Sequence, residues 1–215
     1  MSDAIGVLER IAVWSPYFRV STGPVDDRWR PTADLVDPAT RDALVADTAA
    51  RMDTDEPRVA ASTLFFGYVA RVWSVAIGSV VDSGRCIRLD PEQLLWRNDA
   101  GLHLHITEPG FGDDIVTEVL DRQIEPLVHA WRDVVAAGLL WGNAASALIG
   151  AGRVIGSDAQ PLVDDLLSDP RLADTVDPAT GRRRSCCLYY RTPTGGVCGD
   201  CVFPTPPDDR SKEMP

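Results

Sequence analysis

The chain has 215 residues, 45% of them hydrophobic and 25% charged, which suits one globular domain with a substantial core. Its net charge of −11 argues against nucleic acid as a partner, because binding phosphates requires a basic face. The first residues, Met1 to Ala4, show no basic segment of a secretory signal, so we expect a cytoplasmic protein.

Three helical segments are predicted in the N-terminal part of the chain. The first is an amphipathic segment at residues 5–13, which is followed by an irregular, proline-rich stretch. Asp37 predicts the start of the second as its N-cap, with Pro38 at the first helical position. Glu56 and Pro57 repeat this device ahead of the third.

The third helical segment, residues 59–81, is apolar over almost the length of a membrane span, and its only charge is Arg71. An arginine at mid-depth would cost roughly 2.5–3.5 kcal/mol on insertion scales. We therefore predict a buried core helix rather than a span. Peripheral contact with the inner face of a membrane stays open, and it would suit a protein that receives cargo from an importer.

The middle of the chain changes to patterns that are typical of short strands. Strands are predicted at residues 86–89, 94–97 and 102–106, the last two joined by a turn at 98–101. From residue 113 the apolar period is again helical. Helices are predicted at residues 113–135, 139–154 and 161–167, and Pro126 must kink the first of them or begin a new helix.

Four of the five cysteines fall within sixteen residues near the C-terminus. They are Cys186, Cys187, Cys198 and Cys201, in the pattern Cys-Cys-x10-Cys-x2-Cys. So dense a set predicts metal ligands, because a core position needs only one cysteine. Pro193 and the glycines that follow it predict a fold-back that brings the two ends of the loop together. The spacing favours an iron–sulfur cluster over zinc, because only the last pair has the zinc-knuckle spacing, and it leaves zinc or a disulfide open.

This motif resembles the signature of the FhuF-type ferric siderophore reductases, which also has a tyrosine, a proline and two glycines between the cysteine pairs. The matching residues are Tyr190, Pro193, Gly195 and Gly196. Trp141 and Asn143 resemble a Trp-x-Asn segment that precedes the cluster in that family. The resemblance implies that the four motif cysteines hold a 2Fe–2S cluster and carry the electron transfer.

An arginine run comes directly before the cysteines, and it consists of Arg182, Arg183 and Arg184. These guanidinium groups would stabilise the reduced form of a negatively charged cluster. They would equally suit the acidic face of an electron donor or a ferric chelate, whereas an exposed run that only keeps the loop soluble is the alternative. We take the three arginines and Asn143 as candidate substrate-binding residues, although a structural hydrogen bond explains a buried Asn143 as well.

Other conspicuous residues favour ordinary roles. His103 and His105 face one side of a predicted strand, but no further ligand lies at a convincing spacing. We therefore expect exposure rather than a metal, with a role facing a substrate cleft as the alternative. Cys86 is predicted to be a buried packing thiol. No nucleotide-binding fingerprint is found, so electrons must come from a donor protein such as a ferredoxin or a flavoprotein reductase.

The sequence thus predicts a helix-rich α+β fold with a small antiparallel sheet and a C-terminal cluster-binding loop. We divide it into a reductase-like domain at residues 1–180, a 2Fe–2S segment at 181–203 and a tail at 204–215 that is expected to be disordered. The predicted function is the one-electron reduction of a ferric siderophore, of the hydroxamate type, with release of Fe(II) in the cytoplasm. A non-catalytic iron–sulfur carrier or sensor and a zinc-stapled siderophore-binding module remain alternatives.

Overall fold

A computed structural model describes residues 3–99, 101–177, 180–205 and 207. The tail predicted at 204–215 therefore lies mostly outside the described residues, as does Ala100 in the predicted turn at 98–101.

The N-terminal helices begin where the sequence predicts. Helix α1 spans Ala4–Ile11, α2 spans Pro38–Arg51 and α3 spans Pro57–Ser83. The side chain of Asp37 caps α2, because its carboxylate accepts a hydrogen bond of 2.8 Å from the backbone N–H of Thr40. Two short 3-10 turns, Pro16–Phe18 and Thr32–Val36, lie in the connections on either side of the first strands.

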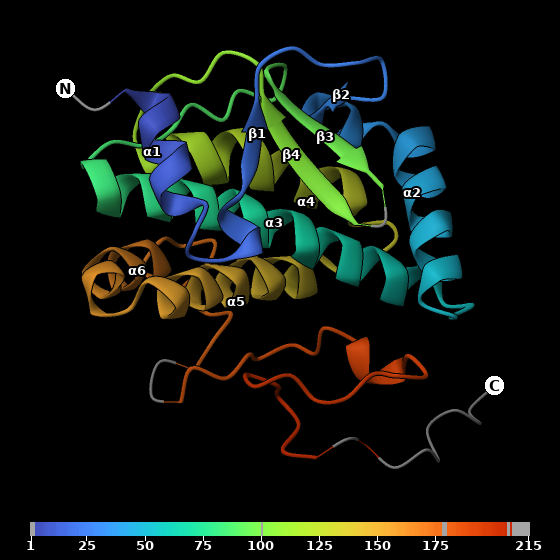
Figure 1. Ribbon diagram of the computed structural model, residues 1–215. Coiled ribbons are helices and arrows are strands. Elements are labelled where there is room, and N and C mark those ends of the chain that lie inside the picture. The colour runs from blue at the N-terminus through green and yellow to red at the C-terminus, as the bar shows by residue number, and fades with distance from the viewer. Residues whose placement is uncertain (1–2, 100, 178–179, 206, 208–215) are drawn as a thin grey trace.

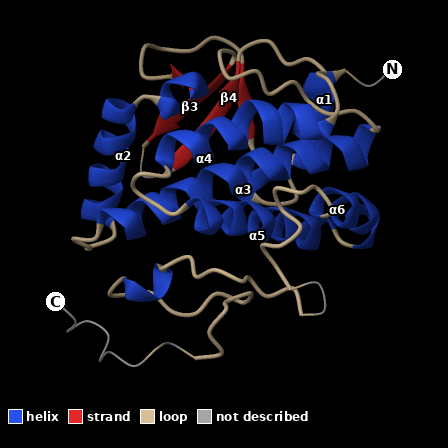
Figure 2. Cartoon of the chain, turned by 180° about the vertical axis from the view of Figure 1, so that it is seen from behind, coloured by secondary structure: helices blue, strands red, loops and turns tan. Residues whose placement is uncertain are grey.

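Helix α3 is the central element of the fold. It lies between the sheet and helix α5 (Ala137–Ile155), with α1 and α2 against it (Figures 1 and 2). By length and composition it could cross a membrane, but 67% of its most apolar window is buried inside the protein. The prediction of a core helix is confirmed by the completely buried side chains of Phe65, Trp73 and Ile77.

The sheet has four strands in the order β1-β4-β3-β2. The predicted hairpin is confirmed as β3 (Leu94–Asn98) and β4 (Leu102–Ile106), which pair antiparallel. The sheet is mixed rather than purely antiparallel, because β1 (Val20–Thr22) runs parallel to β4, while β2 (Arg30–Pro31) adds antiparallel to β3. The strand predicted at 86–89 is reduced to a single bridge between Ile87 and Phe111.

The packed helices and sheet from α1 to α6 form the body of the protein, and the C-terminal half of this body is helical. A π-helix at Val116–Ile124 passes directly into α4 (Glu125–Trp131). Pro126 therefore begins a new helix, which is one of the two outcomes that the sequence predicts. Helix α5 then packs along α3, and α6 (Gln160–Leu167) packs against α5. The α+β, helix-rich fold class is confirmed.

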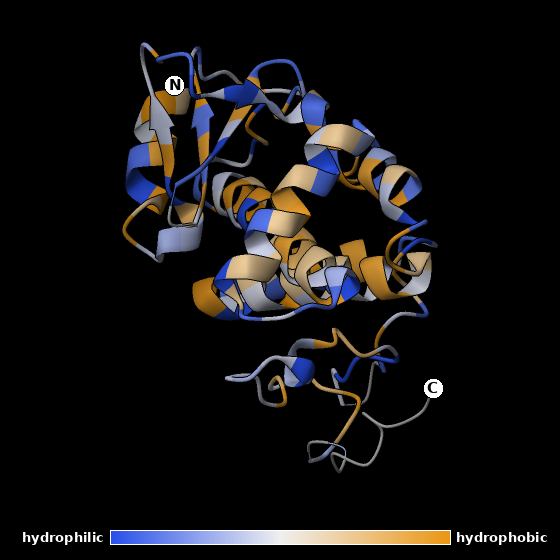
Figure 3. Cartoon of the chain, turned by 90° about the vertical axis from the view of Figure 1, so that its right-hand side faces the viewer, coloured by the Kyte–Doolittle hydropathy of each residue, from blue (hydrophilic) through white to orange (hydrophobic). Residues whose placement is uncertain are grey.

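The hydrophobic core belongs to this body alone. It includes Cys86 but, among the described residues, none of the four motif cysteines. Hydrophobic residues run through the packed helices, and the backbone of the cysteine-bearing segment lies beyond α5 (Figures 1 and 3).

Candidate metal centre

The segment that carries the cysteines folds back on itself, as the turn residues predict. A short 3-10 helix at Tyr189–Arg191 follows Leu188, whose φ of 68° is left-handed. The backbone N–H of Gly195 then donates to the carbonyl of Thr192 at 3.0 Å. A Cβ at position 195 would collide with the carbonyl oxygen of Tyr189, so this close approach requires glycine.

The fold-back brings the two ends of the motif together. The sulfur atoms of Cys187 and Cys198 lie 3.2 Å apart, and all five cysteines of the chain are free thiols. Two backbone N–H groups point at the other two sulfurs, from Leu188 to Cys186 at 3.3 Å and from Phe203 to Cys201 at 3.4 Å. Such N–H donors are what a cysteine sulfur needs when it carries negative charge.

The thiols of Cys186, Cys187 and Cys198 interact closely, and their pKa values shift in opposite directions. The pKa of Cys187 lies far below the ordinary thiol value, because hydrogen bonds from Cys186 and Cys198 stabilise its thiolate, and the charge of Arg183 adds to this. The pKa values of Cys186 and Cys198 are raised in turn, because both thiols face that thiolate. A thiolate is the form of cysteine that binds metal, so the lowered pKa of Cys187 suits a ligand.

The donor set is the one that a two-iron cluster takes. Among the described residues, no group of three or more His, Cys, Asp and Glu side chains is arranged as a site for one metal ion. Structural zinc needs four donors around one point. A 2Fe–2S cluster instead takes two thiolates on each of two irons, and the donor set here is four thiols on one folded loop, so the residues fit that group.

A buried ion pair inside the cysteine segment lies against helices α3 and α5. Arg183 is 4% exposed, and its Nε lies 2.8 Å from Oδ2 of Asp200, the residue that precedes Cys201. The hydroxyl of Ser146 on α5 donates a short hydrogen bond to the same carboxylate oxygen. The ring of Phe66 on α3 lies under the guanidinium, 5.1 Å from its central carbon. Arg183 is therefore held from both helices.

Asn143 completes this connection from inside the protein. It is completely buried on α5, and its Oδ1 accepts a hydrogen bond from Nη1 of Arg183 at 2.5 Å. Its Nδ2 donates to the carbonyl and the hydroxyl of Ser62 on α3, at 3.1 and 3.0 Å. That hydroxyl donates to the carbonyl of Cys187 at 2.8 Å. The contacts of Asn143 are thus those of a positioning residue, which is the structural alternative that we considered for it.

The three arginines do not act as one group. The backbone is extended here, with Arg183 bridged to Val176, so neighbouring side chains alternate in direction. Arg183 points inward, whereas Arg182 and Arg184 are exposed. The side chain of Arg182 donates a long hydrogen bond of 3.3 Å from Nη1 to the carbonyl of Cys201. Only Arg182 and Arg184 are therefore free to meet a large partner.

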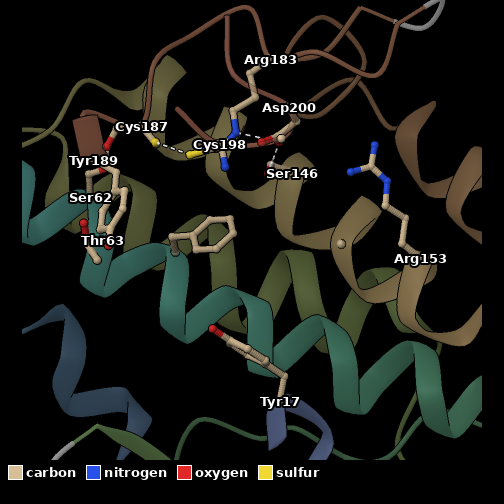
Figure 4. Close-up of a pocket in the computed structure, with 13 residues that line it drawn as sticks. Tyr17, Ser62, Thr63, Ser146, Arg153, Arg183, Cys187, Tyr189, Cys198 and Asp200 are labelled. Atoms are coloured by element: carbon tan, nitrogen blue, oxygen red, sulfur yellow. Dashed lines mark hydrogen bonds and ion pairs between the residues drawn. The ribbon is translucent and has the colours of Figure 1, made fainter. Parts of the chain in front are cut away.

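A cavity of about 430 Å³ adjoins the thiols (Figure 4). Cys187 and Cys198 form part of its wall, together with Arg183, Gly199 and Asp200 of the same segment. The opposite wall comes from the body, and its residues are Tyr17, Ser62, Thr63, Phe66, Ser146, Gly150 and Arg153, with Tyr189 at the cysteine side. Sequence reasoning missed all of these body residues, because those on α3 and α5 look like ordinary members of apolar helices.

The remaining predicted residues lie away from the thiols. His105 is buried, and its ring is held by the hydroxyl of Ser21 at 2.9 Å and the carbonyl of Gly23 at 2.9 Å, whereas His103 is exposed. The expectation of exposure was therefore wrong for His105, because β1 adds to the sheet beside it. Cys86 is buried, as predicted.

The comparisons with known proteins agree with this geometry. Residues 183–203 match the family model of the FhuF 2Fe-2S C-terminal domain, and the four cysteines fit its motif. The segment is thus an iron–sulfur binding domain of the FhuF type, as the resemblance implied, and its cofactor is a 2Fe–2S cluster rather than zinc. A search of curated proteins gave no match to the chain.

Proposed function

We propose that the protein is a ferric siderophore reductase, which passes one electron to an Fe(III)-siderophore and so releases Fe(II). The observation that carries this proposal is the cavity of about 430 Å³ whose wall includes Cys187 and Cys198. When bound, the 2Fe–2S cluster supplies electrons one at a time. A chelate in the cavity would lie directly against Cys187 and Cys198, two of the four cysteines that hold the cluster.

The lining of the cavity suits the periphery of an organic chelate. Tyr17, Phe66 and Tyr189 provide apolar ring surface, and the hydroxyl of Thr63 provides a polar contact. Arg153 brings a positive charge, for which the described residues show no ion-pair partner. We favour a hydroxamate siderophore as substrate, because its hard oxygen donors hold Fe(III) much more tightly than Fe(II), so that one electron is enough to loosen the iron.

The electron donor is proposed to be a separate protein with an acidic docking face, such as a ferredoxin or a flavoprotein reductase. Arg182 and Arg184 are exposed on the extended segment that leads into the cysteines, and their positive charges suit such a face. The reaction is proposed to take place in the cytoplasm, where peripheral contact with the inner membrane would suit the delivery of imported chelate.

Single-turnover reduction tests the proposal. Anaerobically reduced protein, mixed with a ferric hydroxamate and a colorimetric Fe(II) trap, should release about one Fe(II) per cluster and then stop until a donor is added. The substitution Thr63→Trp should fill the cavity and slow this release while leaving the visible spectrum of the cluster unchanged. Ala50→Trp, on the exposed face of α2, is the matched control and should release Fe(II) at the normal rate.

One result would contradict the reductase function, and another would contradict the assignment of the cavity as the chelate site. If an intact, reduced cluster is not reoxidised by any ferric chelate, the protein is an electron carrier or a sensor instead. If chelate reduction proceeds at the normal rate in Thr63→Trp, the reductase function stands but the cavity is not where the chelate binds.

A further inference from the structure

Arg71 is the single charge within an otherwise apolar stretch of the central helix, and the cysteine site does not use it. Its Nη1 donates to the carbonyl of Gly67 at 2.8 Å, and its guanidinium lies over the ring of Tyr17 at 4.9 Å. No carboxylate of the described residues pairs with it. Burial lowers the pKa of Arg71, because the guanidinium has lost water without gaining a counter-ion.

Arg71 lines a second cavity, of about 340 Å³, on the sheet side of α3. Arg19 and Arg97 line the same cavity, with His103 and the ring of Trp29. The three arginines come from separate elements: the connection after the first 3-10 turn, helix α3 and strand β3. The fold therefore gathers positive charge here from distant parts of the chain.

The neighbouring carboxylates do not neutralise this cavity. None of the described acidic residues lines it. Asp99 lies 2.6 Å from Nε of Arg97, and it also approaches Arg28 at 3.8 Å. Asp26 is taken by Arg28, at 2.6 Å. Arg19 donates only a long bond of 3.4 Å to the carbonyl of Ala12, so of the three arginines that line the cavity only Arg97 has an ion-pair partner among the described residues.

A purely structural role does not account for this arrangement. Stacking on Tyr17 explains one face of the Arg71 guanidinium, but it does not explain why Arg19 and Arg97 converge on the same space. Arg97 has Asp99 as a counter-ion, but Arg19 and Arg71 have none among the described residues, and like charges that are brought together with too few counter-ions destabilise a fold. In a protein of net charge −11, acidic residues are abundant enough to have supplied partners. The unpaired charge therefore points to an anion from outside the chain.

We propose that this cavity binds a small organic anion with at least two negatively charged oxygens, through its carboxylate or phosphate groups. The guanidinium fork matches such groups with two parallel hydrogen bonds, and three forks suit a polyanion. Arg97 already stacks on Trp29 at 4.6 Å, so the indole ring forms an apolar wall for the carbon part of the ligand. The size of the cavity is in the range of small-molecule sites.

This site is separate from the cavity beside the thiols, because the two share no lining residue. The proposal therefore does not depend on the reductase function.

Calorimetric titration of the full-length protein, with its cluster intact, tests the proposal. The probes are citrate and inorganic phosphate, with sorbitol as the uncharged control and anionic phosphatidylglycerol vesicles as the lipid alternative. We expect citrate or phosphate to bind and sorbitol not to bind. Arg71→Met should weaken that binding about tenfold or more, and Arg71→Lys should restore part of it.

Arg58→Met is the matched control, since Arg58 lies on the same helix, is exposed and pairs with Glu56 at 3.3 Å. It should bind the anion normally. If Arg71→Met does not fold, Arg19→Gln replaces it, because Arg19 is exposed and makes no ion pair among the described residues. The proposal is overturned if neither anion binds, if binding is unchanged in the cavity variants, or if only the vesicles bind.

Discussion

Replacing Asp200 with asparagine should loosen the cysteine segment without unfolding the body. The change removes the charge that pairs with Arg183 at 2.8 Å, while the shape of the side chain stays the same. It leaves a guanidinium that is 4% exposed without its counter-ion. The hydrogen bond from Ser146 loses its charged acceptor as well.

The expected cost follows from the burial of this pair. Breaking a buried ion pair by removing one partner costs about 3–5 kcal/mol. The side chains of Arg183 and Asp200 are only 3% and 10% exposed, so solvent screening does not reduce this figure much. Since each 1.4 kcal/mol is a factor of ten, the population of the undocked segment should rise at least about 100-fold.

Cluster loss to an iron chelator measures this undocking, and tryptophan fluorescence during urea unfolding measures the body. Asp200→Asn should lose its iron much faster than the unmodified protein, with little change in the urea midpoint. Asp26→Asn is the surface control, because Asp26 and Arg28 are exposed and such pairs contribute about 0–1 kcal/mol. The apolar pair Arg183→Met with Asp200→Leu should recover much of the retention, because no unpaired charge then remains.

An unchanged rate of iron loss in Asp200→Asn would refute this reasoning. It would mean that the segment is held mainly by the cluster itself. A large fall in the urea midpoint would also contradict it, because the ion pair would then support the whole fold.

Three further outcomes are expected. Serine at any one of the four motif cysteines should weaken or abolish the 2Fe–2S absorbance and the bound iron and sulfide, whereas Cys86→Ser should retain both. Burial and nearby carboxylates raise the pKa of Cys86 to about 12 in the folded protein. The unfolded chain therefore ionises this thiol first, and the folded state loses stability as pH rises above about 9. Between pH 8 and about 10.5 the free energy of unfolding of the unmodified protein should fall by about 2 kcal/mol more than that of Cys86→Ala. Glutamine at both Arg182 and Arg184 should lower the reduction potential of the cluster, measured by redox titration. The shift should shrink at high salt, since exposed charges are screened within about 8 Å at physiological ionic strength. An unchanged potential would leave these two residues a docking role.

Local signals explain the parts of the fold that the sequence predicts well. The cap at Asp37 and the new helix at Pro126 depend on the chemistry of one or two residues. Strand β1, at Val20–Thr22, was not predicted, because three half-exposed or exposed residues carry no alternating pattern, and their parallel pairing with β4 is set by contacts more than 80 residues apart.

The site was predicted only where its residues are close in sequence. The cysteines share one short segment, so their spacing indicates a common ligand role. Arg183 could not be distinguished from its neighbours, because its burial depends on Asp200 and on Asn143, 17 and 40 residues away. The position of Asp200 inside the last cysteine pair was the available signal, since an acid there needs a cation beside it.

The separation between the core and the motif cysteines has a consequence for biogenesis. The body completes its hydrophobic core from residues that end before the segment at 183–203, with Val176 as the last member. The core of the body can therefore form before the thiols dock, which would leave the undocked cysteine segment open to the delivery of iron and sulfide. Maturation would then be a late closing step, in which loading of the metal and engagement of Arg183 with α5 happen together, and a chain starved of iron would persist as a folded precursor ready for later repair.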